Sequence, residues 1–164
     1  MSNFYFLALS LSENSLESPT LIDWNALDEL LKDNLSQGDY AAVQKLLSGQ
    51  ISEGDTGFLA QLNQFERTFL TQTTHFRARR LGRQIPFGTD GENCQTLNDL
   101  LEKYYSTPLL LHRKLIEYRL KAFQSGYPLF SLPGILQQVW RLSEIDKWAR
   151  LDRDRGIVEL RRIA

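Results

Sequence analysis

The clearest pattern in the chain is a helical one between residues 58 and 82. Apolar side chains recur there at intervals of 4, 3, 4 and 7 residues, which places them on one face of an α-helix and not on a strand. Because four of the five are phenylalanines, this face is expected to supply much of a hydrophobic core. The apolar face consists of Phe58, Leu62, Phe65, Phe69 and Phe76.

Both ends of this central helix carry residues typical of helix termini. Asp55 or Thr56 can cap its first turn, because either side chain can accept a hydrogen bond from a backbone N–H that the helix leaves unpaired. Gly82 follows the last turn, where a left-handed C′ residue is common. We therefore predict a long central helix over residues 57–81.

Two shorter helices are predicted before it. The first follows Thr20 or Asp23, either of which can serve as N-cap. The stretch 36–38 is expected to end that helix, and Asp39 to cap a second one that stops at Gly49. Two short helices joined by a few residues form a helical hairpin.

Further helices are predicted in the C-terminal half. One begins near Thr96 and is interrupted at Thr107-Pro108. Pro108 suits the first position of a following helix, which we expect to reach Ala122. A last long apolar pattern begins after Pro133-Gly134 and continues past Gly156.

Two stretches do not fit this helical pattern. Residues 4–9 form a continuous apolar run, which we interpret as a buried extended segment or a short strand. Residues 83–93 contain a proline, two glycines and an Asp-Gly pair, so a loop is expected there, either functional or merely a mobile connection. The chain is thus predicted to be all-α, with about six helices in a single domain over 1–164.

Composition agrees with a helical protein and bounds its location. Of 164 residues, 42% are hydrophobic and only three are valine, which favours helices over strands. The single cysteine, Cys94, cannot form an intrachain disulfide, as is usual in a reducing compartment. No apolar stretch reaches the roughly 18 residues of a membrane span, and residues 1–3 lack the basic side chains of a signal peptide. We therefore predict a cytoplasmic protein.

Charge is distributed unevenly along the chain. Residues 1–66 hold 10 acidic and 2 basic side chains, whereas residues 67–164 hold 10 acidic and 17 basic ones. This asymmetry indicates either a basic binding face or two halves that attract each other.

No residue pattern points to catalysis. One cysteine and two histidines, His75 and His112, show no metal-ligand spacing, and each histidine is interpreted as a surface or cap residue. Neither a nucleophile elbow nor a glycine-rich phosphate cradle is present. We therefore predict a protein that is not an enzyme and has no metal or cofactor.

The candidate partner-binding residues are basic or aromatic. Arginines cluster at the end of the central helix, either to contact an acidic or phosphate-rich partner or to form a solvated helix end paired with carboxylates. Two tryptophans eight residues apart share a face and serve either core packing or an interface. Nucleic acid is disfavoured, since the net charge is −1 and no nucleic-acid motif is found. These residues are Arg77, Arg79, Arg80, Arg83, Trp140 and Trp148.

Three segments together resemble a known group of proteins. They are the aromatic start 3–11, the stretch from Phe65-Glu66-Arg67 to Ala78-Arg79-Arg80-Leu81-Gly82, and residues 145–152. With these segments the chain resembles small uncharacterised proteins encoded in bacterial vacuolar-type (V/A-type) ATPase operons. Those proteins are in turn similar to the helical C subunit, called d in eukaryotes, which seats the rotor stalk on the membrane ring.

The resemblance implies a non-catalytic accessory or stalk-like subunit of such an ATPase. Its partners would be protein subunits of the membrane-associated complex, so the protein would be peripheral to the membrane through them. The alternative from the residues alone is a stand-alone module that binds phosphate-rich or nucleic-acid ligands through the same arginines.

Overall fold

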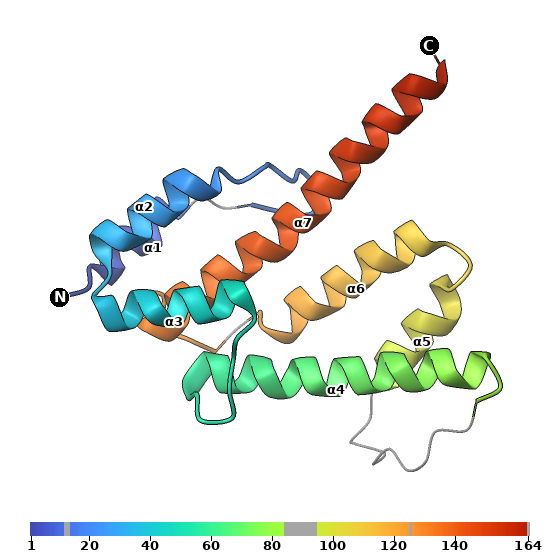
Figure 1. Ribbon diagram of the computed structural model, residues 1–164, viewed down its shortest axis with the longest axis horizontal. Coiled ribbons are helices and arrows are strands. Elements are labelled where there is room, and N and C mark those ends of the chain that lie inside the picture. The colour runs from blue at the N-terminus through green and yellow to red at the C-terminus, as the bar shows by residue number, and fades with distance from the viewer. Residues whose placement is uncertain (12–13, 84–94, 125, 164) are drawn as a thin grey trace. The chain divides into compact units, whose positions relative to one another are not determined.

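The computed structural model describes residues 1–11, 14–83, 95–124 and 126–163, with the side chains of 154–163 excluded. Within these ranges the chain forms seven α-helices and no strand, which confirms the all-α prediction (Figure 1). The helices are α1 (Phe4–Ser10), α2 (Trp24–Asn34), α3 (Gln37–Ser48), α4 (Gly57–Arg80), α5 (Gln95–Tyr104), α6 (Pro108–Ala122) and α7 (Leu132–Ile163).

The chain divides into two compact units, which are described separately below. Unit 1 comprises Met1–Ile51 together with Phe123–Ala164, and unit 2 comprises Ser52–Ala122. Unit 2 is thus one continuous stretch, whereas unit 1 is built from the two ends of the chain. The prediction of a single domain over 1–164 stays a prediction.

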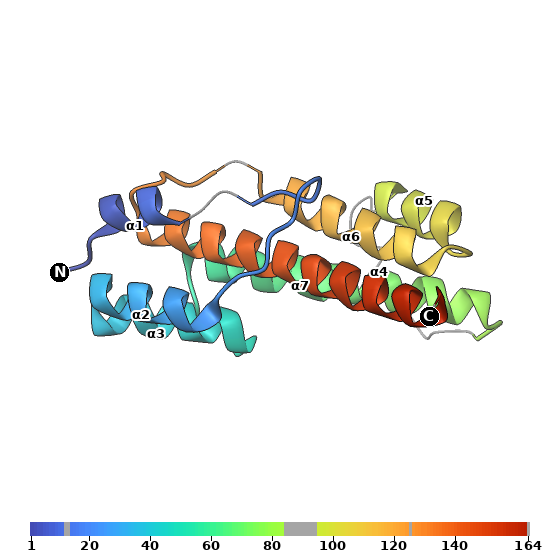
Figure 2. The same cartoon turned by 90° about the horizontal axis from the view of Figure 1, so that it is seen from above.

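Unit 1 is organised along the buried face of α7. Both α1 and α3 pack against α7, and α2 lies against α1 and α3, as Figures 1 and 2 show from two directions. The apolar positions of α7 recur at helical spacing and are almost fully buried, so this one helix supplies much of the core of unit 1. They include Ile135, Leu136, Val139, Leu142 and Ile145.

The predicted extended segment at residues 4–9 is wrong, because these residues form α1. Asn3 caps this helix by accepting a hydrogen bond from the backbone N–H of Phe6 at 3.1 Å. Leu7 is fully buried, whereas Tyr5 and Leu9 remain largely exposed. The apolar run therefore buries only one helical face, and the absence of polar residues within it concealed the helical period.

The helical hairpin of α2 and α3 is confirmed, with a correction at its turn. Asp23 is the N-cap of α2 and accepts hydrogen bonds from the next turn. Ser36, not Asp39, caps α3, so Gly38 lies inside the helix instead of breaking it. The predicted stop at Gly49 is confirmed, since this residue adopts a left-handed φ of 70°.

A buried carboxylate joins the two chain segments of unit 1. Asp146 of α7 is 3% exposed and accepts a hydrogen bond from the backbone N–H of Ile22 at 2.8 Å. Its other oxygen accepts from the indole Nε1 of Trp24 at 2.8 Å and from Nε of Arg150 at 2.7 Å. Burial alone would raise the pKa of Asp146, but these hydrogen bonds and the charge of Arg150 outweigh it and hold the pKa below its ordinary value.

Unit 2 consists of α4 and the hairpin of α5 and α6. Of the predicted phenylalanine face, Phe58 and Phe76 are buried, whereas Phe65 and Phe69 are half-buried beside Tyr118 of α6. The core of this unit is formed by side chains from all three helices. It contains Phe76, Leu97 and Leu101, with Phe69, Leu111, Leu115 and Tyr118 packed against them.

Other predicted boundaries in the two units agree with the structure. The central helix ends at Arg80, one residue earlier than predicted, and Gly82 has a left-handed φ of 65°. Helix α6 begins at Pro108, and the backbone of α7 continues past Gly156 as expected. Most of the predicted loop 83–93 and Cys94 lie outside the described residues.

Candidate partner-binding site

The last two turns of α4 and the residues just after them expose four arginines. Arg77, Arg79, Arg80 and Arg83 are all exposed, as the sequence predicts for a solvated helix end. Successive helical positions are about 100° apart, so residues 77 and 79 point in different directions. The four guanidinium groups therefore do not form one continuous binding face.

Arg80 already has partners within unit 2. Its guanidinium carbon lies 4.2 Å from the ring centroid of Tyr105 and 5.7 Å from that of Phe76. The two rings meet edge to face at 5.8 Å. Arg80 therefore covers the end of the unit 2 core through cation–π contacts, and its guanidinium is less available to a partner than the other three.

Arg77 differs because it lies on a groove. Two adjoining hollows of about 430 and 460 Å³ run along α4 and share Thr73, Arg77 and Leu115 in their walls. We call the two together the α4–α6 groove. Its remaining lining comprises Glu66, Arg67, Phe69, Leu70, Phe76, Leu101, Tyr105, Pro108, Leu111, His112 and Arg119.

The floor of the α4–α6 groove is apolar. Leu111 and Leu115 of α6 meet Phe69 and Phe76 of α4 there. The Thr73 hydroxyl lies within hydrogen-bond distance of the Phe69 and Leu70 carbonyls, at 2.9 and 3.0 Å, so its donor is satisfied inside the helix. A ligand in this groove would therefore meet mainly carbon, with charge only at the edges.

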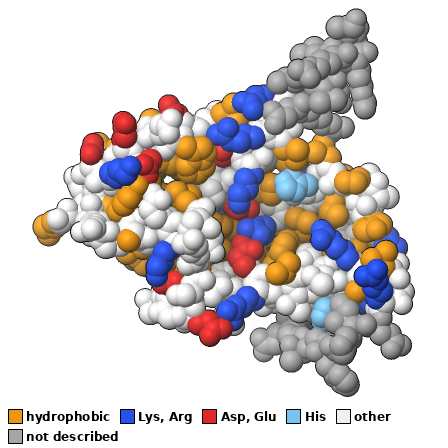
Figure 3. All heavy atoms as spheres, viewed as in Figure 1, with side chains coloured by type: hydrophobic (Ala, Val, Ile, Leu, Met, Phe, Trp, Pro, Cys, Tyr) orange, Lys and Arg blue, Asp and Glu red, His pale blue; other side chains and the backbone are white. Residues whose placement is uncertain are grey.

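The charges at the edges are mainly basic. Glu66 is engaged by the Arg119 guanidinium in two parallel contacts, at 2.9 Å and 2.5 Å, and Glu53 lies 2.8 Å from Arg67. Arg77, by contrast, forms no ion pair within the part of the chain that the structure describes. Figure 3 shows hydrophobic side chains interspersed with Lys, Arg and His over this unit.

The burial of the two tryptophans of the predicted set favours core packing, one of the two roles left open above, over an interface. Trp140 is 4% exposed and packs edge to face on Phe123 with ring centroids 5.1 Å apart. Trp148 is 6% exposed. At 100° per residue, positions 140 and 148 lie on the side of α7 away from Ile135, Val139 and Leu142, and both side chains are too buried to offer a surface to a partner.

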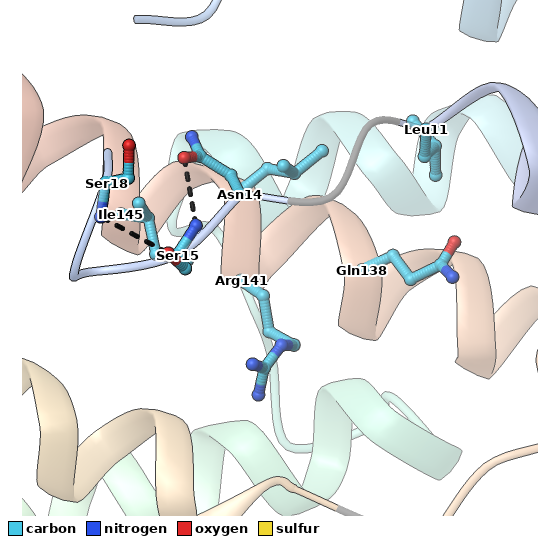
Figure 4. Close-up of a pocket in the computed structure, with 8 residues that line it drawn as sticks. Leu11, Asn14, Ser15, Ser18, Gln138, Arg141 and Ile145 are labelled. Carbon is cyan, nitrogen blue, oxygen red and sulfur yellow. Dashed lines mark hydrogen bonds between the residues drawn. The ribbon is translucent and has the colours of Figure 1, made fainter. Parts of the chain in front are cut away.

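Unit 1 has a hollow of about 540 Å³ between α7 and the segment that precedes α2. Figure 4 shows Arg141 and Gln138 leaving α7 in different directions along it, while Ser15 and Ser18 are joined by a hydrogen bond. Asn14 accepts from the backbone N–H groups of Ser15 and Thr20. The hydrogen bonds of Asn14, Ser15 and Ser18 are made within the segment itself. This hollow is therefore a weaker candidate site than the α4–α6 groove.

The described residues offer no other recognisable chemistry. Among them, no group of three or more His, Cys, Asp or Glu side chains could hold a metal ion. No helix within the described ranges is long and apolar enough to cross a membrane. His75 is half-buried on α4, and His112 is exposed on α6 at the edge of the groove.

Comparison with protein families, with characterised proteins and with solved structures finds no match to this chain. The site therefore rests on the geometry above. Of the predicted residues, only Arg77 lines the groove. The groove is also lined by residues of α5 and α6. The periodicity of the sequence predicts these helices, but it does not predict which of their apolar residues remain uncovered, because that depends on how the helices pack.

Proposed function

We propose that the protein is a non-catalytic helical subunit that binds an acidic surface of another protein through the basic end of α4. The observation that carries this proposal is the exposure of Arg77, Arg79 and Arg83 without an ion pair among the described residues. Glu53 and Glu66, which lie toward the other end of α4, are paired with Arg67 and Arg119. Cations that find no partner in their own unit are suited to carboxylates on another molecule.

The partner that we propose is a subunit of a bacterial V/A-type ATPase. This assignment is supported by the resemblance of three segments to small proteins of such operons, one of which includes most of α4. In that role the protein would be cytoplasmic and would reach the membrane only through its partner subunits.

Co-purification tests the proposal. The tagged protein is isolated from its own host in mild detergent, and the ATPase subunits are quantified by mass spectrometry. We expect these subunits to co-purify in fixed ratio with the wild type. The amount recovered with the Arg79→Glu, Arg83→Glu double variant should be at least about tenfold lower, because the new glutamates repel the acidic surface of the partner.

A matched double variant controls for charge alone. Lys103 and Lys121 are also exposed in unit 2, and their replacement by glutamate changes the net charge equally. This control should keep the subunits bound, and both variants should keep the helical circular dichroism of the wild type. If the wild-type protein returns without ATPase subunits, the proposed partner is wrong.

A second candidate uses the same arginines for a phosphate-rich ligand. Exposed guanidinium groups bind phosphate well, and such binding weakens steeply as salt is added. Inorganic polyphosphate is the probe, measured by calorimetry at about 50 and 200 mM salt. Tight binding that salt abolishes, together with no ATPase subunits in the purification, would favour this candidate over the first.

A further inference from the structure

We propose that the α4–α6 groove binds an acidic amphipathic helix of the partner protein, with its apolar face on the groove floor and a carboxylate on Arg77. The inference rests on the proposed function for the protein nature of the partner. It adds the secondary structure, the charge and the seat of the bound segment.

The length of the groove fits a helix of a few turns. Its lining on α4 extends from Glu66 to Arg77, eleven helical steps that rise about 16 Å. A bound helix that presents apolar residues at positions i, i+4 and i+7 covers about 10 Å with them. Two or three such anchors therefore fit along the two hollows, as in other helix-in-groove complexes.

The floor and rim provide places for those anchors. Leu70 is 66% exposed and Tyr105 is 45% exposed, so both offer apolar area that folding of the described chain leaves uncovered. The half-buried Leu111 and Leu115 also line the groove. Burying this apolar area on binding is favourable and offsets part of the cost of association.

The charges select an acidic segment. Arg77 stands where the two hollows meet, and Arg67 and Arg119 line the first of them. Glu66 is the one acidic side chain among the residues that line the groove, and it is bound to Arg119. A basic helix would be repelled by this rim, whereas an acidic one gains at Arg77 a contact that is charge-assisted.

The openness of the groove favours a helix over a single acyl chain. A fatty acid gains most when its chain is enclosed, but here Leu70 in one hollow and Tyr105 in the other remain exposed. A helix that spans both hollows can cover exposed apolar area in each of them with successive side chains, and it is broader than a single chain of methylene groups. A lipid amphiphile is therefore the alternative that the experiment must separate.

The probe is a fluorescent peptide of about 15 residues, long enough for roughly four helical turns. It has leucine at i, i+4 and i+7 and glutamate on the flanking positions, and a second peptide carries lysine in place of each glutamate. Binding to the full-length protein is followed by fluorescence anisotropy. We expect the acidic peptide to bind at least about tenfold more tightly than the basic one, a difference that one well-placed ion pair can supply.

Two pairs of variants locate the peptide. Leu70→Glu and Arg77→Glu alter the groove, and each should weaken the acidic peptide about tenfold or more. Leu81→Glu and Arg79→Glu make the same chemical changes at exposed positions that do not line the groove, and should leave binding within about twofold. Equal loss in both pairs would place the peptide elsewhere and overturn the inference.

Two other results would also overturn it. One is binding of the basic peptide as tight as that of the acidic one. The other is sodium oleate binding that Leu70→Glu abolishes while neither peptide binds, which would assign the groove to a lipid amphiphile.

Failure of this inference is distinguishable from failure of the proposed function. If the Arg79 and Arg83 reversals release the ATPase subunits but the peptide does not bind, the groove is not the seat and the partner proposal stands. If the peptide binds as expected but no ATPase subunit co-purifies, the groove chemistry stands and the partner is wrong.

Discussion

In unit 1 one buried polar network joins residues more than a hundred positions apart, whereas unit 2 is made of helices that follow one another along the chain. Asp146 reaches back 124 residues to Ile22 and 122 to Trp24. In unit 2 the ion pair between Glu66 and Arg119 spans 53 residues. The two units thus differ in the sequence separation of the contacts that hold them together.

The units also differ in what they leave unsatisfied. In unit 1 both carboxylate oxygens of the buried Asp146 accept hydrogen bonds, and both tryptophans of α7 are buried. Unit 2 leaves Arg77 without an ion pair in the described residues and keeps an apolar groove beside it. Under the proposed function, unit 2 carries the surface for another molecule.

The largest expected effect tests the docking of α1 in unit 1. Leu7 is fully buried, so Leu7→Ala should lower the free energy of unfolding by about 3 kcal/mol through lost contacts and a cavity. Leu9→Ala is the matched control, because Leu9 is 67% exposed on the same helix and should cost less than about 0.5 kcal/mol. Urea denaturation measures both values. Similar losses in the two variants would mean that α1 does not pack through Leu7.

The next effect tests the Asp146 contacts and depends on pH. Asp146→Asn removes the negative charge and turns the amide NH₂ of the asparagine toward a donor that Asp146 now accepts from, such as the Trp24 indole. The free energy of unfolding should therefore fall by about 2 kcal/mol at pH 7. Asp152→Asn, at an exposed position of the same helix, should cost almost nothing.

Acid titration sharpens the same test. Because the folded pKa of Asp146 lies below its unfolded value of 3.8, its contribution is present above that value and is lost as the pH falls through the folded pKa. The wild type should therefore lose more stability than Asp146→Asn between about pH 5 and pH 3. Parallel acid curves for the two proteins would contradict this assignment.

The smallest effect concerns the basic end of α4 in unit 2. Arg80→Ala removes a guanidinium 4.2 Å from the Tyr105 ring and should cost about 0.5 to 1 kcal/mol. Arg79→Ala, its neighbour with no such ring contact, should change stability by less than about 0.5 kcal/mol. Thermal denaturation compares the two. An equal effect would show that the cation–π contact does not stabilise unit 2.

The helices could be predicted from the sequence where polar residues interrupt the apolar ones at regular intervals. This was so for α4, and for α6, where Pro108 marks the first turn. It failed for α1, because residues 4–9 contain no polar position to reveal the period, and at the start of α3, because Gly38 was taken as a breaker although Ser36 caps the helix before it.

The candidate site could be predicted only in part. The exposure of Arg77, Arg79 and Arg83 follows from their place at a helix end, but the contact of Arg80 with Tyr105 depends on where α5 ends beside α4. The network of Asp146 was missed, since the sequence shows it only as an i, i+4 partner of Arg150. Its contacts with Ile22 and Trp24 arise from tertiary packing, which no local pattern encodes.

Because unit 1 is built from the two ends of the chain, its helices become available for packing at different times during synthesis. The chain leaves the ribosome from its N-terminus, so α2 and α3 emerge before the helix that covers them. At about 5 to 20 residues per second, the 124 residues between Ile22 and Asp146 take roughly 6 to 25 s to synthesise. During that time Val43 and Leu46 of α3 lack their cover from α7. Unit 1 can therefore complete its core only after α7 has been synthesised.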